Sequence, residues 1–314
     1  MKNIKVLVLE GGFNEEHEVS IATGTQVKKS LLNLGIEFDS LIVKPLSFEN
    51  DIKNYNRKYI CFNALHGSFG EDGQIQKILD KLSFKYTHSN IQSSNIGFNK
   101  ILTKNIIKDT EILSPKHLTL DYKDINRRLF LEIFVEFGSF IIKPISSGSS
   151  FGIKIFKDIE NINFFFSDLN SNLKIYKNHK KILVEKYIEG RELTVAVINK
   201  NNKSFSIEVT EIIPKNDFFD YKSKYTPGFS EHILPANIPK KIYDKCKSYA
   251  KIIHDKIDCK AVSRSDFIYD EKQVYFLEIN THPGLTSISL VPEQLKYQNV
   301  SFENLILNIL ECSL

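Results

Sequence analysis

The N-terminal part of the chain alternates short apolar strands with helices, and this alternation is the feature that most constrains the fold. The pattern predicts strands at 4–9, 38–43 and 59–65, and helices at 20–34 and 74–82. Such alternation is typical of a doubly wound parallel sheet, which binds ligands beyond the carboxyl ends of its strands. Two glycine-containing loops, at 11–20 and 66–73, follow strands of this predicted sheet. We therefore expect a binding site at these loops.

The pattern changes beyond residue 90. A helix is predicted at 94–108. Further strands are predicted at 140–142, 153–156, 182–185, 193–198 and 205–209, and further helices at 160–169, 239–257 and 302–310. A polar and aromatic loop spans 217–229, and a hairpin spans 263–280. We predict three domains around a shared cleft, with bounds at 1–97, 98–183 and 184–314.

Composition and charge exclude several classes of protein. The 314 residues include 42 Lys and Arg against 38 Asp and Glu, without a basic block, so no nucleic-acid groove is predicted. No apolar run approaches the roughly 18 residues of a membrane span, and the N-terminus lacks the apolar region of a signal peptide. We therefore expect a cytoplasmic protein. The four cysteines are scattered and predict buried thiols, with no zinc site or disulfide framework.

The hairpin at 263–280 carries the most informative polar residues. Side chains on a strand repeat every two residues, so a hairpin centred on Lys272 places Asp266 opposite Glu278 and Arg264 opposite Asn280. Two close carboxylates need a compensating cation, and oxygen ligands of this type suit Mg²⁺ shared with nucleotide phosphates. The alternative is a solvated hairpin face with a surface ion pair. A register slip of one residue would also undo the cross-strand pairs.

Two further segments have the chemistry of a nucleotide site. Lys143 precedes a Gly/Ser loop at 147–152, whose backbone N–H groups can form an anion-binding nest. A simple Gly/Ser turn explains this segment equally well. The segment that leaves the 182–185 strand carries Glu185, Glu189 and Glu192, and a carboxylate at a domain junction can accept hydrogen bonds from an adenine amino group or ribose hydroxyls. Ordinary glutamates on an exposed turn explain this segment as well.

Taken together, these segments resemble the D-alanine–D-alanine ligase family of the ATP-grasp superfamily. The resemblance rests on six phrases in the family's order: 11–20 (GGFNEEHEVS), 65–73 (LHGSFGEDG), 143–152 (KPISSGSSFG), 220–225 (DYKSKY), 264–266 (RSD) and 277–292 (LEINTHPGLTSISLVP). It implies an α/β protein with the ATP-grasp fold and ATP held between the second and third domains. ATP would be bound by Lys100, Lys143, Ser150, Glu185, Lys186, Tyr187 and Glu192. Two Mg²⁺ ions, replaceable by Mn²⁺, would be held by Asp266, Glu278 and Asn280.

The resemblance also implies the reaction, in which two D-alanines are joined through an acyl phosphate for peptidoglycan precursors. The residues implied to act in catalysis are Glu16, Ser149, Tyr225, Arg264, Gly284 and Ser289. Substrate would be bound by His66, Lys224 and Leu290, and the 217–229 loop would close over the site as a lid. The implied partners are D-alanine, ATP and a second copy of the chain in a homodimer.

Departures from the family's pattern and competing functions also follow from the sequence. Ser147 stands where many relatives carry an acidic residue, and Tyr187 where a tryptophan is frequent. A depsipeptide-forming D-Ala–D-lactate ligase, or a ligase for another D-amino acid, is one alternative. A non-catalytic nucleotide-binding protein with the same fold is another. A Rossmann dehydrogenase is disfavoured because Gly11 and Gly12 are not part of a G-x-G-x-x-G motif.

Overall fold

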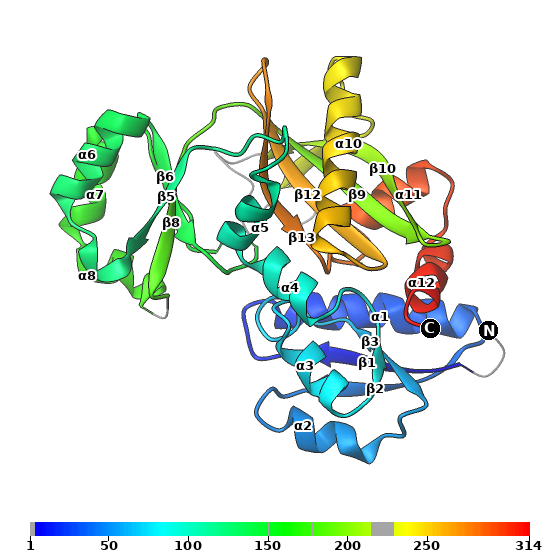
Figure 1. Cartoon of the computed structure of the whole chain (residues 1–314). Coiled ribbons are helices and arrows are strands. Elements are labelled where there is room, and N and C mark those ends of the chain that lie inside the picture. Colours follow the sequence, from blue (N-terminus) through cyan, green and yellow to red (C-terminus); the bar gives the residue numbers. More distant parts are fainter. Residues whose placement is uncertain (1–3, 150, 178, 215–228) are drawn as a thin grey trace.

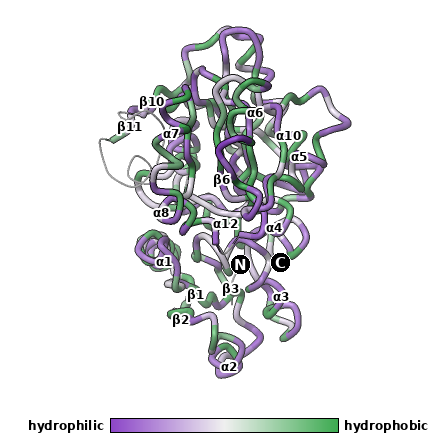
Figure 2. The backbone as a smooth tube through the Cα atoms, turned by 90° about the vertical axis from the view of Figure 1, so that its left-hand side faces the viewer, coloured by the Kyte–Doolittle hydropathy of each residue, from purple (hydrophilic) through white to green (hydrophobic). Residues whose placement is uncertain are grey.

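A computed structural model describes residues 4–149, 151–177, 179–214 and 229–314, and these residues form three sheets with their covering helices (Figure 1). One sheet belongs to the N-terminal segment, one to the central segment and one to the C-terminal segment. The sheets agree with the predicted three-part organisation, while the domain bounds at 97 and 183 stay a prediction. None of the described helices combines the length and the apolar character needed to cross a bilayer. Figure 2 shows hydrophobic and hydrophilic residues interleaved along the chain.

The N-terminal sheet is parallel, as predicted. Its strands lie in the order β2-β1-β3-β4, with bounds β1 Lys5–Gly11, β2 Glu37–Val43, β3 Tyr59–Asn63 and β4 Lys85–Tyr86. The connecting helices are α1 His17–Asn33, α2 Phe48–Asp51, the 3₁₀ helix Ile52–Asn54 and α3 Gln74–Lys81. In β1, Val6 and Val8 pack against α1 and the C-terminal helices, whereas Leu7 and Leu9 pack against α2 and α3. A strand covered on both faces buries every side chain, which explains the unbroken apolar run that the sequence shows.

Asn99 divides the helix predicted at 94–108 into two, so that prediction was wrong. The helices are α4 Ile91–Phe98 and α5 Lys100–Ile107. Asn99 is extended, and its side-chain oxygen accepts hydrogen bonds from the Ile101 and Leu102 N–H groups at 3.1 Å each. This is an N-cap, which satisfies donors that a helix start leaves free. The break places Lys100 at the first position of α5.

The central sheet is antiparallel and carries helices on one face (Figure 1). Its order is β5-β8-β6-β7, with bounds β5 His117–Asp121, β6 Phe140–Pro144, β7 Lys154–Phe156 and β8 Lys181–Lys186. The helices are α6 Arg127–Phe137, α7 Ile159–Ser167 and α8 Leu169–Leu173, with 3₁₀ helices Tyr122–Asp124 and Lys174–Tyr176. Phe140 stacks on Phe156 with ring centroids 4.7 Å apart, in a core shared with α6 and α7. The alternate positions, Ile141 and Lys143, consequently face the opposite side of the sheet, where a cavity lies.

The C-terminal sheet is antiparallel in the order β11-β10-β9-β12-β13. Its strands are β9 Arg191–Lys200, β10 Lys203–Pro214, β11 Ser230–Ile233, β12 Val262–Tyr269 and β13 Val274–Asn280. The helices of this region are α10 Lys240–Ile257, α11 Leu290–Tyr297 and α12 Phe302–Glu311. The apolar face predicted for α10 is confirmed, because Ile242, Cys246, Tyr249, Ile253 and Ile257 are buried. Of the four free cysteines, Cys61, Cys246 and Cys259 are buried, and Cys312 is partly exposed.

The β12–β13 hairpin has the predicted cross-strand pairs, but only because of a bulge. Asp266 lies opposite Glu278 and Arg264 opposite Asn280. Nearer the turn Phe267 pairs with Phe276, so the register shifts by one residue and Leu277 has no partner. The predicted centre at Lys272 was therefore wrong for the turn itself. A regular hairpin with this turn would set Leu277 opposite Asp266, and the bulge moves Glu278 into that place.

Gly24 in α1 leaves space for a buried carboxylate, and this supports a stability prediction. A Cβ atom at Gly24 would lie 2.0 Å from Glu10 Oε2 and 3.0 Å from Glu10 Cβ. Glu10 is buried and pairs with Lys28 at 2.6 Å, so it has little freedom to move. Alanine favours a helix over glycine by about 1 kcal/mol, but overpacking a closed site costs about 1–3 kcal/mol. We expect Gly24→Ala to lower the free energy of unfolding by about 1–2 kcal/mol, measured by urea denaturation.

The matched control is Thr25→Ala, at the next position of the same helix, where the side chain is exposed. This control is expected to change the free energy of unfolding little. A stabilised Gly24→Ala variant would show that Glu10 can give way.

Candidate active site

The carboxylates of the hairpin face a shared cleft between the sheets and are already paired with cations of the protein. Arg264 donates from Nε to Asp266 Oδ1 at 2.9 Å and from Nη2 to Asp266 Oδ2 at 2.8 Å. Thr194 on the neighbouring strand β9 donates to Asp266 Oδ1 at 2.6 Å. Glu278 Oε2 lies 3.1 Å from Lys100 Nζ. The hairpin face is therefore part of a charged site and is not a solvated surface.

A polar cavity brings together most of the predicted catalytic and substrate-binding residues. It is lined by Glu16, His66, Lys100, Ser149, Arg264, Glu278, Asn280, Gly284, Ser289 and Leu290, together with residues that were not predicted. These residues come from all three sheets or their connecting loops. Ser150, Lys224 and Tyr225 lie outside the described residues.

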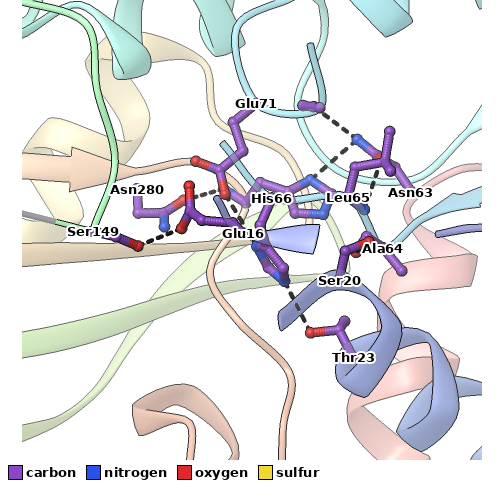
Figure 3. A network of polar contacts seen from close by, with 12 residues as sticks. Glu16, Ser20, Thr23, Asn63, Ala64, Leu65, His66, Glu71, Ser149 and Asn280 are labelled. Carbon is purple, nitrogen blue, oxygen red and sulfur yellow. Dashed lines mark hydrogen bonds and ion pairs between the residues drawn. The ribbon is translucent and has the colours of Figure 1, made fainter. Parts of the chain in front are cut away.

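Glu16 connects the N-terminal segment to the Gly/Ser loop of the central segment. The Ser149 hydroxyl donates to Glu16 Oε1, and Figure 3 shows the two side chains pointing toward each other. Gly67 and Gly148 leave room for this carboxylate, since a Cβ atom at either position would lie 2.4 Å and 3.0 Å, respectively, from Glu16 Oε2. Glu16 is 4% exposed. Its position before α1 therefore serves the cavity rather than only the start of the helix.

His66 lies beside Glu16 and has partners on both ring nitrogens (Figure 3). Its Nδ1 is 3.1 Å from Glu71 Oε1, and its Nε2 is 2.9 Å from Thr23 Oγ1. Burial raises the pKa of Glu71, and the neighbouring Glu16 carboxylate adds to this effect, while the contact with His66 opposes it. Glu71 was not predicted as a site residue, although it belongs to the HGSFGEDG phrase.

Lys100 connects the Gly/Ser loop to the hairpin. Its Nζ donates to the Ser147 carbonyl at 2.9 Å and lies 3.1 Å from Glu278. The Lys100 side chain is 7% exposed, and the residue lines the polar cavity. A cation held between the Gly/Ser loop and an acidic hairpin is well placed for a phosphate group that enters between them.

A second cavity, mostly apolar, lies between the central and C-terminal sheets. The predicted ATP-binding residues Lys143, Glu185, Lys186, Tyr187 and Glu192 line it, and so does Asp266. Its apolar walls come from Ile141, Ile153, Ile155, Ile212, Phe267, Ile268 and Leu277. Glu278 lines both cavities, so the hairpin carboxylates lie where the two meet. Apolar walls of this kind suit a flat base, and the charged junction suits its phosphates.

Glu185 lines the apolar cavity and lies between two lysines. Lys104 Nζ lies 2.6 Å from Glu185 Oε1, and Lys143 Nζ contacts Oε2. Burial alone would raise the pKa of Glu185, but the two ammonium groups lower it to about 2. Burial lowers the pKa of Lys104, against the opposing effect of Glu185. Lys104 was missed in the sequence because its role depends on the break at Asn99, which sets the orientation of α5.

The hairpin residues fit a magnesium site in their donor chemistry. Asp266, Glu278 and Asn280 offer two carboxylates and one amide oxygen, the hard ligands that Mg²⁺ prefers. Among the described residues no group of three or more His, Cys, Asp or Glu side chains is arranged to hold a metal. A metal at the hairpin would consequently be held by this mixed set together with phosphate oxygens.

Comparison with known proteins agrees with this geometry. A family model described as D-ala D-ala ligase C-terminus matches residues 106–311. The D-alanine–D-alanine ligase of Wolbachia pipientis wMel is 39% identical, and the match covers 98% of this chain and 94% of that relative. This chain belongs to the D-alanine–D-alanine ligase family.

Comparison with solved structures shows that this chain has the ATP-grasp fold. The D-alanine–D-alanine ligase from Bacillus anthracis complexed with ATP is 25% identical with a TM-score of 0.80, and the match covers 100% of this chain and 97% of that one. The VanG D-Ala:D-Ser ligase from Enterococcus faecalis is 24% identical with a TM-score of 0.78, and the match covers 100% of both chains. At that identity the second likeness shows the fold alone.

Proposed function

We propose that this family member is an ATP-dependent ligase that joins two D-alanines into D-alanyl-D-alanine for peptidoglycan precursors. The observation that carries the proposal is the polar cavity, where Glu16, Ser149, Arg264 and Gly284 surround one space beside Glu278. The adjoining apolar cavity would receive the adenine, with Glu192 near the ribose. Phosphates would then lie where the cavities meet.

The reaction is proposed to proceed in two steps. The carboxylate of the first D-alanine attacks the γ-phosphate of ATP, and ADP leaves from the resulting acyl phosphate. The amine of the second D-alanine then attacks the acyl carbon, and phosphate leaves. Both steps concentrate negative charge, so preorganised cations supply much of the rate acceleration.

The residues of the polar cavity are proposed to divide the work of binding and catalysis among them. Glu16, held by Ser149, would bind the ammonium group of the first D-alanine, with His66 beside it. Arg264 and the Gly284 N–H would stabilise the oxyanion. The carboxylate of the second D-alanine would lie near Ser289 and the Leu290 N–H at the start of α11.

The phosphate groups and the metal would meet the charged junction. Lys100 and Lys143 would contact the phosphates, with Ser150, Lys186 and Tyr187 completing the nucleotide site. Two Mg²⁺ ions, replaceable by Mn²⁺, would be held by Asp266, Glu278 and Asn280. When bound, they would neutralise phosphate charge together with the lysines. The proposed lid would include Lys224 and Tyr225.

The assay that tests this proposal measures ADP and phosphate release together with dipeptide formation. Purified protein is supplied with MgATP and with D-alanine, D-serine, D-lactate or L-alanine. We expect D-alanyl-D-alanine in one-to-one ratio with ADP. The D-Ala:D-Ser ligase that shares this fold makes the choice of second substrate the decisive comparison. Turnover with another pair only would overturn the substrate assignment, and a thermal shift with MgATP without turnover would indicate a non-catalytic nucleotide-binding protein.

Location and assembly are part of the same proposal. A ligase that uses ATP and supplies a cell-wall precursor would work in the cytoplasm, where ATP is present. The family resemblance supports a homodimer. Size-exclusion chromatography with light scattering would test this, since a monomer has half the expected mass.

A further inference from the structure

Two histidine–glutamate pairs line or adjoin the polar cavity, and the second lies outside the predicted site. The first is His66 with Glu71. The second joins His232 on β11 to Glu293 in the first turn of α11, with His232 Nδ1 2.9 Å from Glu293 Oε2. His232 lines the polar cavity together with Arg264, Gly284 and Ser289. A carboxylate that holds one imidazole nitrogen fixes the tautomer and the orientation of the ring.

The second ring nitrogen distinguishes the two histidines. His66 is 3% exposed, and its Nε2 contacts Thr23 at 2.9 Å, so both nitrogens have close partners. His232 is 19% exposed, and the contact of its Nε2 with Ser230 is long, at 3.3 Å. His232 is therefore the better placed of the two imidazoles to exchange a proton with a molecule in the cavity.

The first turn of α11 holds His232 at the cavity through Glu293. Ser289 precedes this helix, and Ser289 and Leu290 line the polar cavity. Under the proposed function the carboxylate of the second D-alanine lies there. Glu293 belongs to the first turn of the same helix and holds His232 against it. An α-amino acid has its amine one carbon from its carboxylate, so that amine would lie on the same side of the cavity.

Among the residues that the structure describes, the other charged groups lining the cavity have partners of their own. A free amino acid carries an ammonium group at neutral pH, and this group must lose a proton before its nitrogen can attack. Lys100 and Arg264 are cations, Glu278 pairs with Lys100, Glu71 pairs with His66, and Glu16 accepts a hydrogen bond from Ser149.

We propose that His232, oriented by Glu293, accepts the proton of the second D-alanine's ammonium group; this rests on the proposed function. An N–H bond breaks and the proton moves to Nε2. The nitrogen lone pair then forms the C–N bond at the acyl carbon, and the C–O bond to phosphate breaks with its electrons leaving on phosphate. The excess proton on the new amide nitrogen leaves with that phosphate.

A third cavity, distinct from the polar and apolar cavities, gives the imidazole a path to release its proton after each turnover. His232 and Ile288 line both the polar cavity and an outer cavity of about 810 Å³ beside α1, α11 and α12. The charged groups of the outer cavity are Lys29, Glu293, Lys296 and Glu303. Water in that cavity can carry the proton away, because the cavity is partly open.

The test compares two nucleophiles in His232→Gln. Hydroxylamine is unprotonated at neutral pH and traps acyl phosphates as hydroxamates, so it needs no base. We expect dipeptide formation at neutral pH to fall by roughly 10²-fold or more, and hydroxamate formation from D-alanine and ATP to change by less than about 3-fold. Raising the pH toward the pKa of the free amine should restore much of the dipeptide rate. Glu293→Gln should show the same pattern with a smaller loss.

The control is His179→Gln, a histidine of the central segment away from both cavities, which should behave as the unmodified protein. Thermal unfolding of each variant shows that it is folded. Equal loss of both products, an unchanged dipeptide rate, or a raised KM for D-alanine without a change of pH profile would each overturn the role of His232. Absence of hydroxamate in the unmodified protein would instead contradict the proposed function.

Discussion

Replacing Glu278 by glutamine is expected to lower the rate of dipeptide formation by roughly 10³-fold, with a much smaller change in ATP affinity. Glu278 lines both cavities and lies opposite Asp266. Glutamine keeps the shape of the side chain and removes one negative charge from the place where metal and phosphates would meet. Steady-state kinetics and isothermal titration with MgATP would separate the two effects. A higher Mg²⁺ concentration for half-maximal rate is also expected.

The matched control is Glu271→Gln in the turn of the same hairpin. Glu271 is 67% exposed, lies 3.9 Å from Arg191 and lines neither cavity. Its loss should leave kcat and KM unchanged. A near-normal rate in Glu278→Gln would refute the proposed metal site, because a carboxylate that helps to hold a metal ion cannot lose its charge without lowering the rate.

Replacing Glu185 by glutamine is expected to lower the free energy of unfolding by about 3–5 kcal/mol. The side chain is fully buried between Lys104 and Lys143, and the two lysine side chains are only 1% and 6% exposed. Without the carboxylate, two ammonium groups remain in a buried site with no counter-charge beside them. Urea denaturation at neutral pH, followed by circular dichroism, would measure the loss.

The loss in Glu185→Gln should shrink as the pH rises. Burial already lowers the pKa of Lys104 while Glu185 is present, and removing the carboxylate lowers it further. The folded variant then binds fewer protons than the unfolded chain, so its stability increases with pH. Glu136→Gln is the control, since Glu136 pairs with Lys116 at the surface with both side chains 57% exposed, and little effect is expected. A deficit that grows with pH would contradict the argument.

Much of the fold followed from local patterns in the sequence. The parallel N-terminal sheet was predicted from alternating strands and helices, and β12 and β13 from their alternating side chains. The amphipathic face of α10 was predicted equally well. By contrast, β5 and α6 were not predicted. Most residues of β5 are half-buried, so the strand has only a weak hydrophobic pattern. The break at Asn99 was missed because an extended asparagine interrupts an otherwise continuous helical pattern.

The candidate site likewise contains residues that the sequence identified and contacts that only the fold revealed. Glu16, His66, Ser149 and Glu278 stand in contiguous phrases that resemble a known family, so each was identifiable before any contact was known. The pairing of His232 with Glu293 joins residues 61 positions apart, which no local pattern reveals.

The sequence by itself determined which polar side chains share a strand face, because alternation along a strand depends only on neighbouring residues. The tertiary structure alone decided that a bulge at Leu277 sets Glu278 opposite Asp266. It also decided that Lys104 and Lys143 enclose Glu185 and that His232 reaches the cavity. These contacts join separate elements, and their energies depend on burial and on distances that only the packed fold creates.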